Sequence, residues 1–177
     1  MKQLAEIKAE VERLASLIEV DATYLPTFGL SEQSGRPHID VDAHGYHYIH
    51  AERGSEFARM TTQDLDELLY TALSGATFWM GVRYELRHRV VGQDCRRVMF
   101  QRQIELLTAV SPAWAQRRSA EIAGILSEHP LDDRAIERAR LTRELREQGH
   151  APEEASQMAL ERYPRPTEPG KPESGNA

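Results

Sequence analysis

The hydrophobic positions of the first twenty residues predict an amphipathic helix. Apolar side chains recur there at spacings of three and four residues, the period of an α-helix with one buried face. They are Leu4, Ile7, Val11, Leu14 and Ile18. The glutamates lie largely off this stripe, and the polar face is not the Lys/Arg-rich face of a membrane-surface helix. We therefore expect a helix over residues 3–19 that packs on a core.

The period changes to two between residues 38 and 52, which predicts a β-hairpin. Residues 38–42 and 46–52 alternate in character, and the short connection between them contains a glycine, Gly45, that tolerates a positive φ. Two strands alone are only marginally stable in water, so the hairpin needs a third strand or a helix beneath it. The segment 24–28 is the candidate for that strand.

Residues 61–130 form the longest stretch with helical periodicity, and we expect the rest of the chain to be organised around it. A helix that begins with Thr61 and Asp64 as a variant capping box should reach about residue 90. Asp94 is a cap for the next helix, over about 94–109. Ser111-Pro112 predicts the start of a third helix, which reaches residue 129. Gly75 and Gly81 interrupt the first helix, so a kink or close packing is expected there.

The chain after Pro130 changes in composition. Residues 131–163 predict two short, charge-dense helices, and residues 164–177 are rich in Pro, Gly, Glu and Ser, which is typical of disorder. We expect one α+β domain over 1–130, an appended helical pair over 131–163 and a disordered tail over 164–177. The predicted fold class is α+β, mostly helical. An N-terminal helix and a small antiparallel hairpin or three-stranded sheet precede a bundle of three to five helices.

Charge and composition narrow the functional classes. The formal net charge is −6, and the first 60 residues are the most acidic part, so direct nucleic-acid binding is not expected and a basic partner would be complementary. Cys95 is the only cysteine, which excludes an internal disulfide. The sequence has no apolar run long enough for a membrane span and no signal-peptide pattern. These features predict a cytoplasmic protein without an anchor.

The hairpin carries the first candidate site for chemistry. Histidines and carboxylates at alternating strand positions can converge on a metal ion. The residues concerned are His38, Asp40, Asp42, His44, His47 and His50. Their spacing matches no zinc pattern, and polar residues at every other position also describe the solvent face of a strand. We therefore expect no metal and no other cofactor.

An arginine-rich segment, residues 83–102, is the second candidate. Arginine clusters bind phosphate or carboxylate groups in a bidentate manner. No Gly-rich phosphate loop accompanies the cluster, so pairing of Arg96 and Arg97 with the acidic N-terminal part and with Glu52 is the favoured interpretation.

Nucleophilic catalysis has little support. Cys95 could pair with a histidine such as His88, but a lone cysteine outside a recognisable signature is more often a small apolar residue. Walker A, GxGxxG, HExxH and GxSxG motifs are absent from the sequence. We expect no catalytic residues.

A series of short motifs appears in a fixed order between residues 40 and 133. It consists of Tyr46, His47, Tyr48, Glu52, Arg53 and Gly54; Asp64 to Tyr70; Tyr84, Glu85, Leu86 and Arg89; Asp94, Arg96, Arg97 and Phe100; Trp114; and His129, Pro130 and Asp132. In order and spacing this series resembles the immunity protein 63 family of bacterial polymorphic toxin systems. Residues 134–177 lie outside the likeness.

The resemblance implies a small cytosolic immunity protein that binds a cognate toxin and neutralises it by occlusion, without catalysis. Physical reasoning assigns the binding surface to the acidic and aromatic hairpin: Asp40, Asp42, His44, Tyr46 and Tyr48. Tyrosines are favoured at interface cores, and carboxylates would meet a basic toxin. The alternative is that the tyrosines pack on Trp79 or Trp114.

The charged family positions allow a structural interpretation. Glu52, Arg53, Asp94, Arg96 and Arg97 are expected to form a cluster that ties the end of the hairpin to the helix that begins at Asp94. Two other functions stay open. One is an intracellular regulatory or adaptor domain that binds a protein through residues 131–162. The other is a metal- or phosphate-dependent enzyme, which would require a deep pocket that gathers His47, His50, Glu52 and Arg97.

Overall fold

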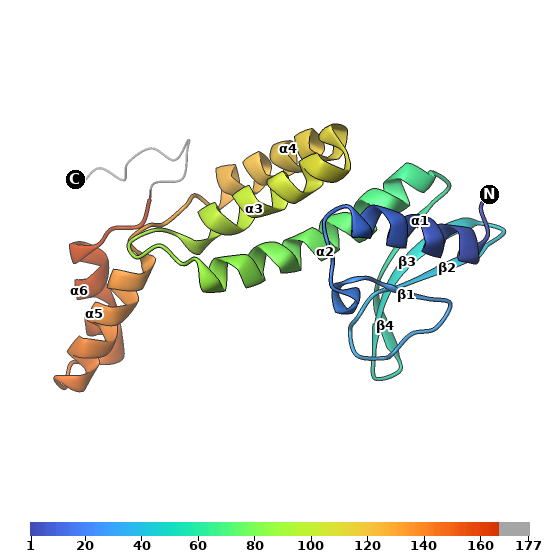
Figure 1. Cartoon of the computed structure of the whole chain (residues 1–177). Coiled ribbons are helices and arrows are strands. Elements are labelled where there is room, and N and C mark those ends of the chain that lie inside the picture. Colours follow the sequence, from blue (N-terminus) through green and yellow to red (C-terminus); the bar gives the residue numbers. More distant parts are fainter. Residues whose placement is uncertain (167–177) are drawn as a thin grey trace.

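The computed structural model describes residues 1–166 and confirms the predicted α+β, mostly helical class. The residues 167–177 of the predicted tail lie outside the described part. In chain order the elements are α1 (Leu4–Ser16), the 3₁₀ helix η1 (Ala22–Tyr24), β1 (Thr27–Phe28), β2 (His38–Asp42), β3 (Gly45–Glu52), β4 (Ser55–Thr62), α2 (Leu65–Arg87), α3 (Cys95–Val110), α4 (Pro112–Glu128), α5 (Ala135–Glu147) and α6 (Pro152–Arg162) (Figure 1).

The strands form one mixed sheet in the order β1-β2-β3-β4. β2 and β3 make the predicted hairpin, and Ile39 lies opposite Tyr48 in its register. The third strand predicted within 24–28 is the short β1, which runs parallel to β2. A fourth strand, β4, pairs antiparallel with β3. The described sheet thus has one strand more than the three that the sequence predicts at most.

β4 overturns the predicted start of the long helix. Thr61 lies opposite His47 in the sheet, so it cannot cap a helix. The N-cap is Asp64, whose side chain accepts a hydrogen bond from the backbone N–H of Asp66 at 2.9 Å. β4 is an edge strand with most of its residues exposed, and it therefore lacks the alternation of apolar residues that marks a half-buried strand.

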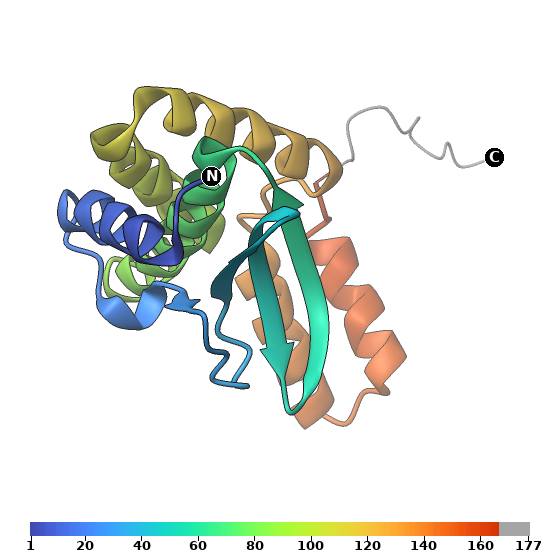
Figure 2. The same ribbon diagram turned by 90° about the vertical axis from the view of Figure 1, so that its right-hand side faces the viewer.

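One face of the sheet packs against α1 and the N-terminal half of α2 (Figures 1 and 2). The core between these layers contains Ile7 and Val11 from α1, Ile39 from β2 and Leu68 from α2, all fully buried. The predicted stripe of the first helix is thus confirmed. The opposite face of β3 buries His47 and Ile49 among strand side chains.

The second half of α2 extends beyond the sheet and packs on α3, which in turn packs on α4. Asp94 and Ser111 cap α3 and α4 as predicted, each accepting a hydrogen bond from a backbone N–H in the first turn. The close packing expected at Gly81 is present, because a Cβ on that residue would lie 2.7 Å from the carbonyl oxygen of Met99. Because Gly81 has no side chain, the backbones of α2 and α3 can lie in direct contact at this point.

The predicted pair of C-terminal helices is present as α5 and α6, which pack mainly on each other. Ala155 and Ala159 of α6 are fully buried, and Leu145 of α5 is buried. Figure 1 places this pair at the end of α2 that lies away from the sheet. We propose that α5 and α6 are an appendage to a single domain over residues 1–130. Within residues 1–166, no helix is both long enough and apolar enough to span a bilayer.

Candidate functional site

The structure separates the five residues of the predicted binding surface onto two faces of the sheet. Tyr46 and Tyr48 point into the core and are only 3% and 7% exposed. The Tyr46 hydroxyl accepts a hydrogen bond from the backbone N–H of Lys2 at 2.8 Å, and burial raises the pKa of the Tyr48 hydroxyl. Both tyrosines are therefore mainly packing residues of the core, and the ring that Tyr48 meets edge-on is that of His50 and not the expected Trp79 or Trp114.

Asp40, Asp42 and His44 are exposed at the other face of the sheet and in the β2–β3 turn. Asp42 Oδ1 lies 2.8 Å from His47 Nε2 and also accepts the backbone N–H of His44 at 2.7 Å. The interactions with His47 and then with the His44 amide lower the pKa of the Asp42 carboxyl. This carboxylate is thus ionised and held in place at the surface.

The hairpin histidines do not gather around one point. His47 Nδ1 lies 2.9 Å from Thr61 Oγ1, and His50 Nδ1 lies 3.3 Å from the carbonyl oxygen of Gly35. Within the described residues 1–166, no three histidine, cysteine or acidic side chains are close enough together to hold a metal ion. The polar face of the sheet is built from local pairs.

The predicted charged cluster is only partly assembled, and its expected link to the hairpin is wrong. Asp94, Arg96 and Arg97 do lie together at the start of α3, where Arg96 forms a forked ion pair with Asp94 at 2.7 Å. Arg96 also donates to the carbonyl oxygens of His129 and Pro130, and Arg97 pairs with Asp133 at 2.8 Å. The cluster therefore holds the α4–α5 connection.

Glu52 and Arg53 lie at the β3–β4 turn, far from this cluster. They form an exposed ion pair with each other at 3.4 Å, and the backbone N–H of Arg53 donates to Gln33. Figure 1 shows that the turn and the start of α3 are separated by the length of α2. The pocket of His47, His50, Glu52 and Arg97 that an enzyme would require is consequently not formed.

Cys95 is exposed at the first residue of α3. Its suggested partner, His88, stacks on the Tyr84 ring at 3.9 Å between ring centroids and contacts the Tyr84 carbonyl oxygen through Nδ1 at 2.9 Å. Through this stacking and the Nδ1 contact, His88 packs locally at the end of α2. The arrangement gives no support to a Cys–His nucleophile pair.

A surface that the sequence did not reveal lies where α2 emerges from the sheet. A hollow of about 690 Å³ is lined there by side chains from the η1–β2 segment, from β3 and from α2, among them Tyr24, Tyr48, His50 and Trp79. Trp79 is 55% exposed, which is unusual for so large an apolar side chain. The sequence indicated Trp79 only as a packing partner for the hairpin tyrosines, because periodicity alone does not show where the covering sheet ends.

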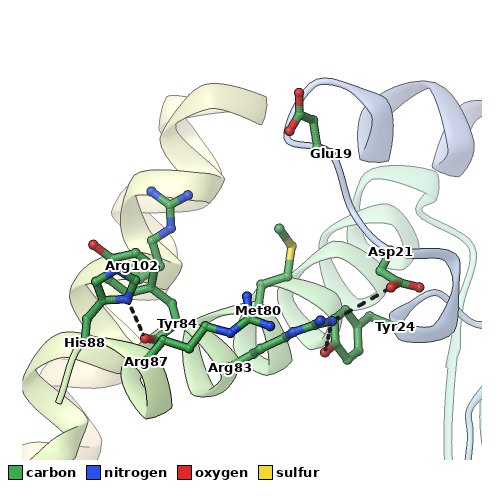
Figure 3. Close-up of a pocket in the computed structure, with 9 residues that line it drawn as sticks. All are labelled: Glu19, Asp21, Tyr24, Met80, Arg83, Tyr84, Arg87, His88 and Arg102. Atoms are coloured by element: carbon green, nitrogen blue, oxygen red, sulfur yellow. Dashed lines mark hydrogen bonds and ion pairs between the residues drawn. The ribbon is translucent and has the colours of Figure 1, made fainter.

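A second hollow of about 210 Å³ lies beside the first, between the end of α1, α2 and α3 (Figure 3). Arg83, Arg87 and Arg102 line it, together with Tyr24 and with the acidic residues Glu19 and Asp21. Arg83 donates to the Tyr24 hydroxyl at 3.4 Å and lies 3.9 Å from Asp21. Tyr24 and Arg83 thus form the ridge between an aromatic hollow and a basic one.

Comparison with known proteins finds a family match for the central part of the chain. The family model described as Immunity protein 63 matches residues 42–124, from the end of β2 into α4. This match confirms the resemblance and leaves α1, β1, α5 and α6 outside the matched segment. Searches of the curated proteins and of the solved structures returned no match.

Proposed function

We propose that this protein, whose residues 42–124 match the family model described as Immunity protein 63, binds a cognate bacterial toxin in the cytoplasm and neutralises it by occlusion. The family match is the observation that carries the proposal, because it implies an immunity role. A protein that inhibits by occlusion needs a stable binding surface but no catalytic group. The rigid packing of α2, α3 and the sheet supplies such a surface.

We assign part of the toxin contact to the exposed carboxylates of Asp40 and Asp42 and to the neighbouring His44. The carboxylates of Asp40 and Asp42 project from the uncovered face of the sheet, where they would steer a basic patch of the toxin by charge. Tyr46 and Tyr48 contribute from behind, because their packing in the core holds β3 and hence the β2–β3 turn in place.

Co-expression tests the function directly. The C-terminal domain of a toxin encoded beside this chain should arrest growth when expressed alone, and co-expression of the full chain should restore growth. A complex should co-purify and survive size-exclusion chromatography. Equal toxicity with and without this chain, in cells that contain both proteins, would refute the immunity role.

A charge-reversal variant tests whether the acidic face of the sheet contacts the toxin. Replacement of Asp40 and Asp42 by lysine should weaken the complex and reduce its sensitivity to salt, because exposed charges act through screened, long-range attraction. The matched control is Glu12→Lys on α1, an exposed carboxylate away from the hairpin. If the double variant binds the toxin as tightly as the control, the acidic face is not part of the interface.

An adaptor function for α5 and α6 is the second candidate. Ile136 of α5 is 54% exposed, and within residues 1–166 the two helices pack mainly on each other, which would suit a separate binding module. An adaptor of this kind would lose its activity when residues 134–177 are removed, whereas an immunity protein that uses residues 42–124 would keep it.

A further inference from the structure

The apolar stripe that α2 presents to the sheet continues after the sheet has ended. Positions 68, 72, 75, 79, 82 and 86 follow one another at alternating spacings of four and three, so they share one face of the helix. Leu68 and Ala72 are fully buried, and Gly75 lies next to the Tyr48 hydroxyl of β3. Trp79 and Leu86, further along the same stripe, are 55% and 64% exposed. The second half of the stripe therefore lacks the cover that the first half has.

The uncovered stripe borders the aromatic hollow, which has the size of a binding site. Its volume of about 690 Å³ falls in the range of roughly 300–1,000 Å³ that is usual for ligand pockets. Tryptophan, tyrosine and arginine dominate the binding energy of protein interfaces, and all three line this region. Trp79 from α2, Tyr24 from η1 and Arg36 from the β1–β2 connection supply them.

The basic hollow beyond the Tyr24–Arg83 ridge indicates which charge a bound partner should carry. Arg102 is 3.2 Å from Glu105 and Arg83 is 3.9 Å from Asp21, but Arg87 forms no ion pair with any described residue. Figure 3 shows the Arg87 side chain running along this hollow toward Arg83. Arg83, Arg87 and Arg102 outnumber Glu19 and Asp21 in this hollow, so the guanidinium of Arg87 beside an exposed apolar stripe favours an acidic occupant.

We propose that Trp79, Leu86 and Arg87 form a docking surface for an apolar segment of the toxin that carries acidic side chains. The apolar side chains of that segment cover Trp79 and Leu86, and its carboxylates bind Arg83 and Arg87. The assignment rests on the proposed immunity function and adds to it the chemistry of a second contact, distinct from the acidic face of the sheet.

Charge argues against a second copy of this chain as the occupant. In a two-fold contact the same patch faces itself, so Arg87 of one copy would face a hollow in which Arg83, Arg87 and Arg102 outnumber Glu19 and Asp21. The C-terminal residues 167–177 carry no large apolar side chain that could cover Trp79. A separate, acidic and apolar partner meets both requirements.

The test uses the full chain and two synthetic peptides that differ only in charge. Both are fluorescein-labelled amphipathic helices with leucine at helical spacing, one with glutamate and one with lysine at the remaining positions. Fluorescence anisotropy should show at least ~10-fold tighter binding of the glutamate peptide, and Trp79→Ala and Arg87→Glu should each weaken it ~10-fold or more, as expected for interface anchors. Leu30→Ala and Arg13→Glu are the matched controls on exposed residues elsewhere and should leave binding unchanged.

The same variants are then measured against the toxin domain, after circular dichroism has established that each is folded. Loss of toxin binding in Trp79→Ala and Arg87→Glu, with the controls unaffected, supports the docking surface. Unchanged toxin binding in both variants, or equal binding of the two peptides, overturns it while the immunity function stands. Sedimentation of the wild-type chain is measured as well. A dimer that forms in the wild type and is lost in Trp79→Ala would also overturn the proposal, because a second copy of the chain would then cover the stripe. Failure of the wild-type chain to bind the toxin at all would instead refute the proposed function.

Discussion

Asp133 accepts a hydrogen bond from the backbone N–H of Asp94 at 2.8 Å, across 39 residues of chain. The contact is reciprocal, because Asp94 Oδ2 accepts the backbone N–H of Asp132 at 2.8 Å. Arg97 adds two hydrogen bonds to the Asp133 carboxylate, at 2.9 and 2.8 Å. Two segments of chain, the start of α3 and the α4–α5 connection, thus cap one another, and this joint positions α5 and α6.

The joint should loosen at low pH. Hydrogen bonds from Arg97, and then the Asp94 amide, lower the pKa of Asp133 from 3.8 to about 2. A carboxyl group whose pKa is lower in the folded than in the unfolded state stabilises the fold above its unfolded pKa, and this contribution is lost as the pH falls toward its folded pKa. We expect the Asp94 amide resonance to shift between about pH 4 and pH 2. Asp133→Asn should reduce this shift, and an unchanged titration in the variant would show that Asp133 does not control the joint.

Two helical glycines should respond to alanine with opposite signs. Gly81→Ala places a Cβ 2.7 Å from the Met99 carbonyl oxygen and should destabilise the protein by about 1–3 kcal/mol, as overpacking does. Gly124, in α4, has open space at the corresponding position, so Gly124→Ala should stabilise by up to ~1 kcal/mol through helix propensity. Urea denaturation of both variants measures the difference. Equal effects would mean that α2 and α3 are not in backbone contact at Gly81.

The ion pair between Arg117 and Glu67 should couple α4 to the start of α2. Arg117 makes a forked contact with Glu67 at 2.5 and 2.9 Å, and its guanidinium lies 3.8 Å from the centre of the Tyr70 ring. The side chains of Arg117 and Glu67 are 42% and 33% exposed, so solvent screens their attraction. We therefore expect a coupling free energy between them of only about 0.5–1 kcal/mol in a double-mutant cycle. Arg117→Lys should recover little of it, because lysine lacks the planar fork. A coupling indistinguishable from zero would contradict the assignment.

Removal of residues 134–177 should leave the main core folded. The buried cluster of the sheet, α1 and α2 is built from residues before the α4–α5 connection, and α5 packs mainly on α6. Retaining Asp132 and Asp133 keeps their backbone and side-chain contacts with α3. We expect the truncated chain to melt cooperatively within a few degrees of the full chain and to neutralise the toxin. Loss of neutralisation with the fold intact would favour the adaptor function of α5 and α6.

The elements that could be predicted from the sequence are those whose signals are local. The stripe of α1, the alternation of β2 and β3, and the caps Asp94 and Ser111 each depend on residues within a few positions of one another. β4 could not be predicted in this way. It is held by backbone pairing to β3, and an exposed edge strand needs no regular pattern of apolar residues.

The partners of charged and aromatic side chains could be predicted less well. The sequence indicated that Arg96 and Arg97 form structural ion pairs, but it did not show that their partners lie at residues 129–133 and not at Glu52. Likewise, alternation indicates that Tyr46 and Tyr48 share a face of β3, whereas the identity of the covered face depends on where α1 and α2 pack.

The sequence by itself determined the class of fold, most helix and strand positions and the family resemblance, because periodicity, capping and motif order are properties of neighbouring residues. The tertiary structure alone decided which stretches of those elements are covered. Leu68 and Trp79 lie on the same stripe of α2, yet only Leu68 lies beneath the sheet. The physical reason is that burial of a helix residue depends on how far a second element, here the sheet, extends along the helix. The periodicity of the helix sequence carries no information about that extent.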